Sequence, residues 1–234
     1  MPLRRSLLAG PVLEVAPKVL GRVLRCTTDE GVVAVRLTEV EAYDGPNDPG
    51  SHAYRGQTAR NAVMFGPPGF LYVYFTYGMH FCMNISAGPD GQPSAVLLRA
   101  GEIVEGADLA RARRGAANGQ QVKFNQSGGV KAGRSAGVLP GPVAKRPNGN
   151  PDRDLARGPA RMCVALGIGR DDNGADLLSK DSHVQLLPGP GFDGEPATGP
   201  RVGLREAADW PWRFWIPGEP TVSPYRPHVP KRRA

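Results

Sequence analysis

Residues 31–43, Gly-Val-Val-Ala-Val-Arg-Leu-Thr-Glu-Val-Glu-Ala-Tyr, form a long β-prone run. Side chains of a β-strand point alternately to its two faces. One face of an unbroken strand would therefore carry apolar residues followed by two acids and a phenol: Val33, Val35, Leu37, Glu39, Glu41 and Tyr43. Arg36 and Thr38 would take the other face. The pattern predicts one long strand whose mostly apolar face ends in polar side chains.

A β-hairpin is predicted after this strand. Residues 70–75, Phe-Leu-Tyr-Val-Tyr-Phe, and residues 81–85, Phe-Cys-Met-Asn-Ile, are β-prone runs on either side of Thr76-Tyr-Gly-Met79. Gly78 permits a tight turn between the two strands. Tyr77 would then lie at or near the tip of a protruding hairpin.

The other expected elements are short. We expect a strand at residues 95–98, helices at 102–114 and 157–166, and strands at 184–187, 201–204 and 213–216. Strands with few helices between them indicate an α+β fold with a curved, mainly antiparallel or mixed sheet. Since 234 residues suit one hydrophobic core, we expect a single compact domain over residues 1–234.

Positive charge is concentrated in one part of the chain. Lysine and arginine total 29 against 22 acidic residues, which gives a net charge of +7. No acidic residue lies between Asp108 and Asp152, and within that segment residues 115–150 are rich in Gly, Asn, Ser, Gln and Pro. This composition predicts a basic, flexible insertion loop. The charge favours a polyanionic partner, although a solvated basic surface is the alternative.

Metal, disulfide and membrane sites are not expected. Cys26, Cys82 and Cys163 lie far apart, which predicts free, buried thiols, and the four histidines lack the spacing of metal-binding pairs. Pro11 and Glu14 interrupt the first apolar run too early for a signal peptide, and no run is long enough to span a membrane. We expect a cytoplasmic protein without a membrane partner.

Several polar and aromatic residues are candidates for chemistry. Glu41 is the most informative acid, because a carboxylate on an apolar face is costly to bury unless it is paired or used. Glu39 follows the same argument, and either side chain could simply be salt-bridged. Tyr72 and Tyr74 alternate along a strand, which is typical of core packing. A tyrosine at a hairpin tip, as predicted for Tyr77, has as much reason to contact a partner.

Six blocks of the sequence, in this order along the chain, resemble the alkyladenine (3-methyladenine) DNA glycosylase family. They are Thr38–Tyr43, Leu71–Met79, Phe81–Ser86, Leu97–Ala100, Gly158–Arg161 and Gly199–Gly203. The resemblance covers nearly the whole chain except the basic insertion. It implies one compact domain, a β-hairpin that enters the DNA minor groove, and no metal or cofactor.

The resemblance also implies a reaction and its catalytic residues. The family members are monofunctional base-excision-repair enzymes that flip alkylated or deaminated purines out of double-stranded DNA and hydrolyse the N-glycosidic bond. The implied substrates are 3-methyladenine, 7-methylguanine, hypoxanthine and ethenoadenine, and we expect a monomer. Glu41 matches the general base that activates water for attack on the sugar C1′. Arg99 and the main-chain carbonyl of Val202 match groups near that water.

Further positions match the family's base-binding and DNA-inserting residues. Tyr43, His52 and Tyr74 match the walls that enclose the flipped base. Asn84 matches a side chain that clashes with the exocyclic amine of normal guanine. The DNA-inserting positions are Tyr77 and Met79. His52, in the loop of residues 49–56, would without the resemblance be read as a solvated histidine.

Two alternatives belong to other functional classes. A non-catalytic module that binds damaged DNA would use the same hairpin and basic surface, but a carboxylate such as Glu41 facing a polyanion would weaken its affinity. A glycosidase of free sugars or nucleosides would use Glu39 and Glu41 as its acid and base. That reading is disfavoured because side chains at i and i+2 point the same way, whereas paired glycosidase carboxylates flank the scissile bond.

Overall fold

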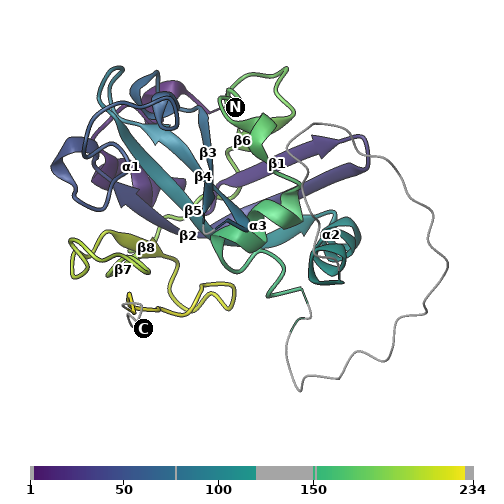
Figure 1. The fold of residues 1–234 in the computed structure, drawn as a ribbon. Helices are drawn as coiled ribbons and strands as arrows, with labels where there is room; N and C mark the ends of the chain where they lie inside the picture. The colour runs from purple at the N-terminus through teal and green to yellow at the C-terminus, as the bar shows by residue number, and fades with distance from the viewer. Residues whose placement is uncertain (1–2, 77, 120–149, 151, 230–234) are drawn as a thin grey trace.

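The computed structural model describes residues 3–76, 78–119, 150 and 152–229. These residues form a single eight-stranded sheet with three α-helices, α1 (Val12–Val19), α2 (Ala107–Gly119) and α3 (Pro159–Leu166). Figure 1 shows a strongly twisted, curled sheet with α3 lying across it and α2 beside its β1–β2 end. The architecture confirms the predicted α+β class.

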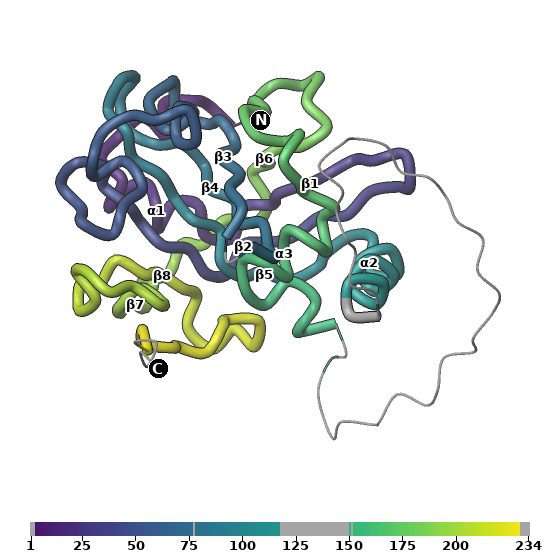
Figure 2. Tube along the Cα trace, viewed as in Figure 1, coloured from purple at the N-terminus to yellow at the C-terminus, as the bar shows by residue number. Residues whose placement is uncertain are grey.

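The sheet is antiparallel at every strand pair. Its main order is β3-β4-β5-β2-β1-β6, and β8 pairs with both β2 and β7. The strands are β1 (Val23–Thr28), β2 (Gly31–Tyr43), β3 (Leu71–Thr76), β4 (His80–Ala87), β5 (Ser94–Glu105), β6 (Val184–Leu187), β7 (Ala197–Gly199) and β8 (Arg213–Trp215). The C-terminal part of the chain therefore returns to β2, as the tube in Figure 2 also shows.

Strand β2 joins the two halves of the sheet because it has three neighbours. One edge pairs with β5 along most of its length, while the other edge pairs first with β1, over residues 31–36, and then with β8, over residues 39–41. The prediction of a strand at 31–43 is confirmed, as is the hairpin β3–β4. The end of β2 is thus held on both sides.

The two faces of β2 differ from the prediction. The apolar core contains five of its side chains: Val33, Val35, Leu37, Val40 and Ala42. The change from odd to even positions occurs between Leu37 and Val40, where the pairing with β5 shifts its register. A β-bulge of this kind redirects the side chains that follow it. Glu39, Glu41 and Tyr43 therefore point away from the core, and the prediction that they share the face of Val33, Val35 and Leu37 is wrong.

Other element boundaries also differ from the sequence-based expectations. The strand predicted at 95–98 extends to Glu105, because it continues to pair with β2, and the helix predicted at 102–114 runs instead from Ala107 to Gly119. Gly106 separates the two elements with φ +76°, and a Cβ there would lie 2.0 Å from the Val32 carbonyl oxygen. Residues 201–204 form no strand, and helix α1 and strand β1 were not anticipated.

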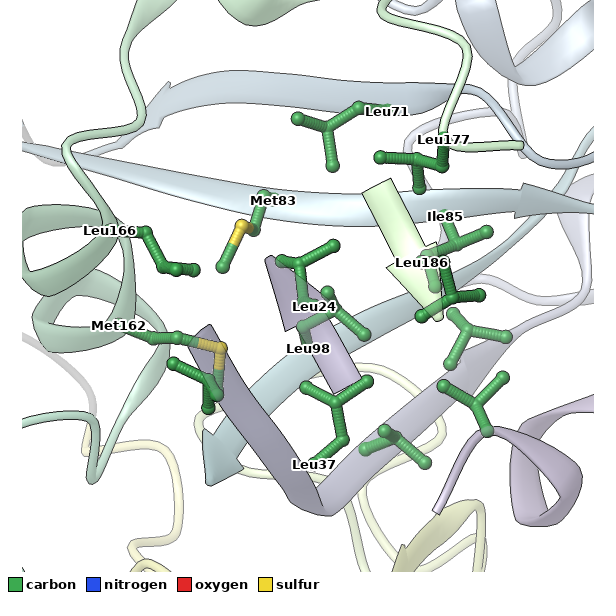
Figure 3. Close-up of a cluster of buried hydrophobic side chains, with 14 of the residues drawn as sticks. Leu24, Leu37, Leu71, Met83, Ile85, Leu98, Met162, Leu166, Leu177 and Leu186 are labelled. Carbon is green, nitrogen blue, oxygen red and sulfur yellow. The ribbon is translucent and has the colours of Figure 1, made fainter. Parts of the chain in front are cut away.

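The hydrophobic core lies between the sheet and the helices α1 and α3. Figure 3 shows Met162 and Leu166 of α3 next to Met83 of β4 and Leu98 of β5. Cys26, Cys82 and Cys163 are free and buried, as expected. Most of the predicted basic loop, residues 120–149 and 151, lies outside the described residues. No helix in the described part of the chain is long and apolar enough to cross a membrane.

Candidate active site

A cavity of about 340 Å³ opens on the face of the sheet opposite the core. Strand alternation creates this face: Leu71 and Val73 of β3 belong to the core, whereas Tyr72 and Tyr74 line the cavity. The lining residues come from several strands and loops: Tyr43, Gly50, His52, Met64, Tyr72, Tyr74, Thr76, Cys82, Asn84, Ala95, Leu97, Arg99, Pro159, Val202, Gly203 and Leu204. Six of the predicted site residues therefore surround one space.

Glu41 lies directly beneath the wall of this cavity. Its side chain is fully buried, and all three groups that bind its carboxylate line the cavity. The Tyr43 hydroxyl donates to Oε2 at 2.8 Å, and the Val202 main-chain N–H donates to Oε1 at 2.7 Å. Arg99 Nη1 forms an ion pair with Oε1 at 3.2 Å. The Val202 N–H thus serves a side chain, and residues 201–204 form no strand.

Arg99 connects Glu41 to the second buried acid of β2, Glu39. Its Nε donates to Glu39 Oε1 at 2.9 Å while its Nη1 contacts Glu41. Burial alone would lower the pKa of Arg99, but the carboxylates of Glu41 and Glu39 outweigh burial and raise it. A permanently charged guanidinium therefore lies between the two acids.

Glu39 is held by further groups that do not line the cavity. Arg213 Nη1 donates to its Oε1 at 3.2 Å, and the hydroxyl and main-chain N–H of Ser223 donate to its two oxygens at 2.9 and 2.6 Å. Sequence reasoning missed Arg213 and Ser223. The β-prone run at 213–216 placed Arg213 on a strand, but no local pattern linked Ser223 to the site.

Four aromatic rings line the cavity, those of Tyr43, His52, Tyr72 and Tyr74. His52 and Tyr74 meet edge to face with ring centroids 4.6 Å apart, and Tyr72 lies 5.5 Å from Tyr74. Burial raises the pKa of both Tyr43 and Tyr74, so their phenols stay protonated. Tyr72, which the sequence pattern favoured as a core residue, is buried but belongs to the cavity wall.

His52 is the polar member of this aromatic group. Its Nδ1 lies 3.0 Å from the Tyr72 hydroxyl, and the residue as a whole is exposed to solvent. Packing against the wall, together with the positive charge of Arg60, lowers the pKa of the imidazole to about 4. His52 is therefore neutral at physiological pH and offers a ring that carries no charge.

Asn84 and the neighbouring Cys82 come from β4. The Asn84 side chain is buried, and its Nδ2 donates to the Tyr72 carbonyl oxygen at 3.2 Å, which fixes the orientation of the amide in the cavity. Burial raises the pKa of the Cys82 thiol, so this cysteine is an unreactive wall residue rather than a thiolate. Sequence reasoning identified Asn84 and missed Cys82 as a lining residue.

The hairpin tip adjoins the cavity wall, which includes Thr76. Met79 is 70% exposed and Phe75 is 41% exposed, although both are apolar. The Met79 N–H donates to the Thr76 carbonyl oxygen at 3.2 Å, and Gly78 has φ +68°, so the turn is tight. The predicted wedge residue Tyr77 lies outside the described residues. An apolar surface therefore projects from the end of the sheet.

Among the described residues, no group of three or more His, Cys, Asp or Glu side chains could hold a metal ion. Of the described lysines, Lys18 and Lys180, neither lines the cavity. The buried acid whose partners all line the cavity is Glu41.

Comparison with known proteins gives consistent matches along nearly the whole chain. The sequence model of the methylpurine-DNA glycosylase family matches residues 6–220. A protein of Streptomyces avermitilis is 50% identical over 235 residues, which cover 99% of this chain and 95% of its own length. A protein of Leifsonia xyli is 51% identical over 231 residues, covering 97% and 93%. Both relatives carry the provisional name 3-methyladenine DNA glycosylase.

Proposed function

The chain belongs to the methylpurine-DNA glycosylase family and is a DNA glycosylase, and from this premise we propose that it flips damaged purines into the cavity beside Glu41 and hydrolyses their N-glycosidic bond. The observation that carries the proposal is the fully buried Glu41, whose partners Tyr43, Arg99 and Val202 all line the cavity. A carboxylate in such a position is a candidate general base.

The walls suit a flat, electron-poor base. A flipped purine enters between Tyr43 and the His52–Tyr74 pair, where aromatic faces stack on its ring. The cavity of about 340 Å³ lies within the range of roughly 300–1,000 Å³ common for small-molecule sites. Alkylated purines that carry a positive charge gain from the electron-rich tyrosine rings. Candidate substrates are 3-methyladenine, 7-methylguanine, hypoxanthine and ethenoadenine.

The reaction needs one activated water. The water oxygen attacks the sugar C1′ while Glu41 takes a proton from that water. The bond from C1′ to the base nitrogen breaks, and the base leaves with the electron pair of that bond. The Tyr43 hydroxyl bonds to Glu41 Oε2. The water must therefore share that oxygen with the hydroxyl or displace it when the base enters.

Arg99 and Val202 hold the carboxylate in place for this step. Both bind Oε1, which leaves Oε2 as the oxygen directed at the water. In this geometry Val202 contributes its main-chain N–H to Glu41, whereas the family resemblance led us to expect its carbonyl at the water. Both contacts are compatible, because one residue presents its N–H and its carbonyl in different directions.

Asn84 and the hairpin tip provide selection and extrusion. The Asn84 amide, which lines the cavity and is fixed by its bond to the Tyr72 carbonyl, would reject normal guanine by clashing with its exocyclic amine. The exposed Met79, together with Tyr77 two positions before it in the sequence, would insert into the minor groove and offset part of the unstacking cost of a few kcal/mol. The net charge of +7 favours binding to double-stranded DNA.

The test is release of free base from duplexes that each carry one candidate lesion, under single-turnover conditions. We compare the native chain, Glu41→Gln and Glu14→Gln, in which an exposed acid of α1 is changed as a matched control. The native chain and Glu14→Gln should release base, while Glu41→Gln should bind the duplex without releasing it. If none of the three forms released base while all of them bound the duplex, the result would instead indicate a non-catalytic damaged-DNA-binding module.

A further inference from the structure

Arg201 is a fully buried cation behind the cavity wall. Its Nη2 donates to Asp48 Oδ1 at 2.8 Å, its Nη1 also contacts Asp48, and Nη1 donates to the Ala42 carbonyl oxygen at 2.9 Å. Neither Arg201 nor Asp48 exposes any of its side chain, and neither lines the cavity. A buried ion pair of this kind is costly to form and contributes little net stability. Its position relative to the cavity is therefore more informative than its energy.

The Arg201 guanidinium packs over two aromatic rings. Its Cζ lies 4.6 Å from the centroid of Tyr43 and 5.0 Å from that of Trp212. Tyr43 lines the cavity and Arg201 does not, so the cation lies on the buried side of this ring. A planar cation held by a bidentate carboxylate restricts how a ring against it can tilt.

Asp48 extends the same contact to the loop that carries His52. Its Oδ1 accepts a hydrogen bond from the Gly50 N–H at 2.8 Å, and the Ser51 N–H donates to its carbonyl oxygen at 2.9 Å. Gly50 is close to both sides of this contact, because a Cβ there would lie 3.0 Å from Arg201 Nη2 and 2.8 Å from Leu204 Cδ1. The loop therefore packs directly on the ion pair.

Arg201 also precedes Val202, the residue whose N–H binds Glu41. Three segments that form the cavity meet at this one side chain: the end of β2 at Ala42 and Tyr43, the 48–52 loop, and residues 201–204. We propose that Arg201, paired with Asp48, is a positioning residue that orients the Tyr43 ring for base stacking and sets the Val202 N–H on Glu41. This inference rests on the proposed function and adds a residue that touches neither base nor water.

The test compares Arg201→Lys with Arg5→Lys. Arg5 is a matched control, since it also pairs with an aspartate (Asp176, 2.8 Å), donates to a main-chain carbonyl (Pro68) and packs over a ring (Phe70, 5.2 Å), but lies away from the cavity. Lysine keeps the positive charge and loses the planar fork. Each variant is measured for single-turnover release of hypoxanthine, for affinity toward a duplex with a tetrahydrofuran abasic analogue, and for melting temperature.

A positioning role predicts a specific pattern. Arg201→Lys should release base roughly 10²-fold more slowly, since small misplacements of a reacting group have effects of that size. Its affinity for the abasic duplex should stay within about threefold of the native value, because Arg201 contacts no DNA in this account. Arg5→Lys should lower the melting temperature without changing the rate.

A spectroscopic readout separates positioning from general loosening. In a Glu41→Gln background, the fluorescence of ethenoadenine in a bound duplex should change on stacking against Tyr43. Adding Arg201→Lys should reduce that change, whereas adding Arg5→Lys should leave it intact. Equal fluorescence with and without Arg201→Lys would overturn the proposed control of Tyr43.

A second variant keeps the inference testable if Arg201→Lys does not fold. Trp212→Leu removes one of the two rings against Arg201 and leaves the Asp48 ion pair intact. It should slow base release in the same direction by about tenfold. A folded Arg201→Lys, or a folded Trp212→Leu, that releases base at the native rate would overturn this inference and leave the proposed function standing. A native chain that releases no base would overturn the proposed function itself.

Discussion

Glu39 and Glu41 lie two residues apart on the same side of β2, and neither side chain is exposed, yet the regions around them differ. Glu39 accepts four hydrogen bonds, from Arg99, Arg213 and both donors of Ser223. Glu41 accepts hydrogen bonds from Tyr43 and Val202 and pairs with Arg99. Of the partners of Glu39 only Arg99 lines the cavity, whereas every partner of Glu41 does.

The difference shows how one short stretch of strand can carry a structural acid beside an acid whose partners all line a cavity. A carboxylate oxygen that accepts several bonds inside the protein has little capacity left for a substrate or a water. Glu39 uses its oxygens to join β2 to β8 and to the segment at Ser223. Among the described residues, Oε2 of Glu41 accepts a hydrogen bond from the Tyr43 phenol alone, next to the cavity. We therefore expect changes at Glu39 to alter stability and changes at Glu41 to alter the reaction.

The largest effect is expected when the cation shared by the two regions is removed. Arg99→Leu leaves two buried carboxylates without their common partner, so it should lower the free energy of unfolding by about 3–5 kcal/mol and abolish base release. Urea denaturation measures the first effect. Arg36→Leu is the control, because Arg36 also pairs with two glutamates, Glu102 and Glu219, but nearer the surface. Equal losses in the two variants would contradict the special role of Arg99.

A smaller loss of stability is expected from Glu39→Gln. The amide keeps two or three of the contacts but leaves Arg213 without its buried charge partner, so the free energy of unfolding should fall by about 2–3 kcal/mol. Below the melting temperature, base release should fall by less than about tenfold, because Glu41 and the cavity keep their own contacts. Loss of base release in a folded Glu39→Gln protein would show that the two acids act together.

Tyr43→Phe tests the phenol that distinguishes the region around Glu41. The ring and its stacking face remain, while the hydrogen bond to Glu41 Oε2 is lost. A hydrogen bond to a charged group contributes about 1.5 kcal/mol, so single-turnover release should slow by about tenfold. A rate equal to or faster than the native rate would mean that the hydroxyl only blocks the approach of water.

The smallest effect concerns His52, the polar member of the aromatic cavity wall. Its pKa of about 4 lies below the ordinary value near 6.5, so the unfolded chain binds more protons between these two pH values. The contribution of this group to stability is therefore full above pH 6.5 and is lost as the pH falls toward 4. An NMR titration of the imidazole checks this, and a midpoint at or above pH 6 would show that the ring is not packed as described.

Much of the fold followed from local patterns in the sequence. Alternating β-branched and aromatic residues predicted β2, the β3–β4 hairpin and β6 at or near their true bounds. The helix α1 was missed because Pro11 and Pro17 interrupt its short helical pattern of apolar residues. In the structure Pro11 precedes the helix, and four residues of α1 enter the core. The extension of β5 to Glu105 depends on pairing with β2, a contact that no local window contains.

The candidate site shows the same limit. The resemblance selected Glu41, Tyr43, His52, Tyr74 and Asn84, and the structure gathers all five at the cavity. The predicted direction of the Glu39 and Glu41 side chains is wrong, because a bulge near Leu37 changes which face the following residues take. That bulge arises where β2 pairs with both β5 and β8. Two partners of Glu39, namely Arg213 and Ser223, lie more than 170 residues from it in the sequence. No local sequence pattern identifies them, because these contacts exist only in the folded chain.

The most direct test of this account is the single-turnover rate of base release by Glu41→Gln, measured on a hypoxanthine duplex beside its free energy of unfolding. We expect a rate about 10²- to 10⁴-fold below native, the range expected for loss of a general base. We also expect a smaller loss of stability than in Glu39→Gln. A folded Glu41→Gln protein that releases base within about threefold of the native rate would remove Glu41 from its proposed role.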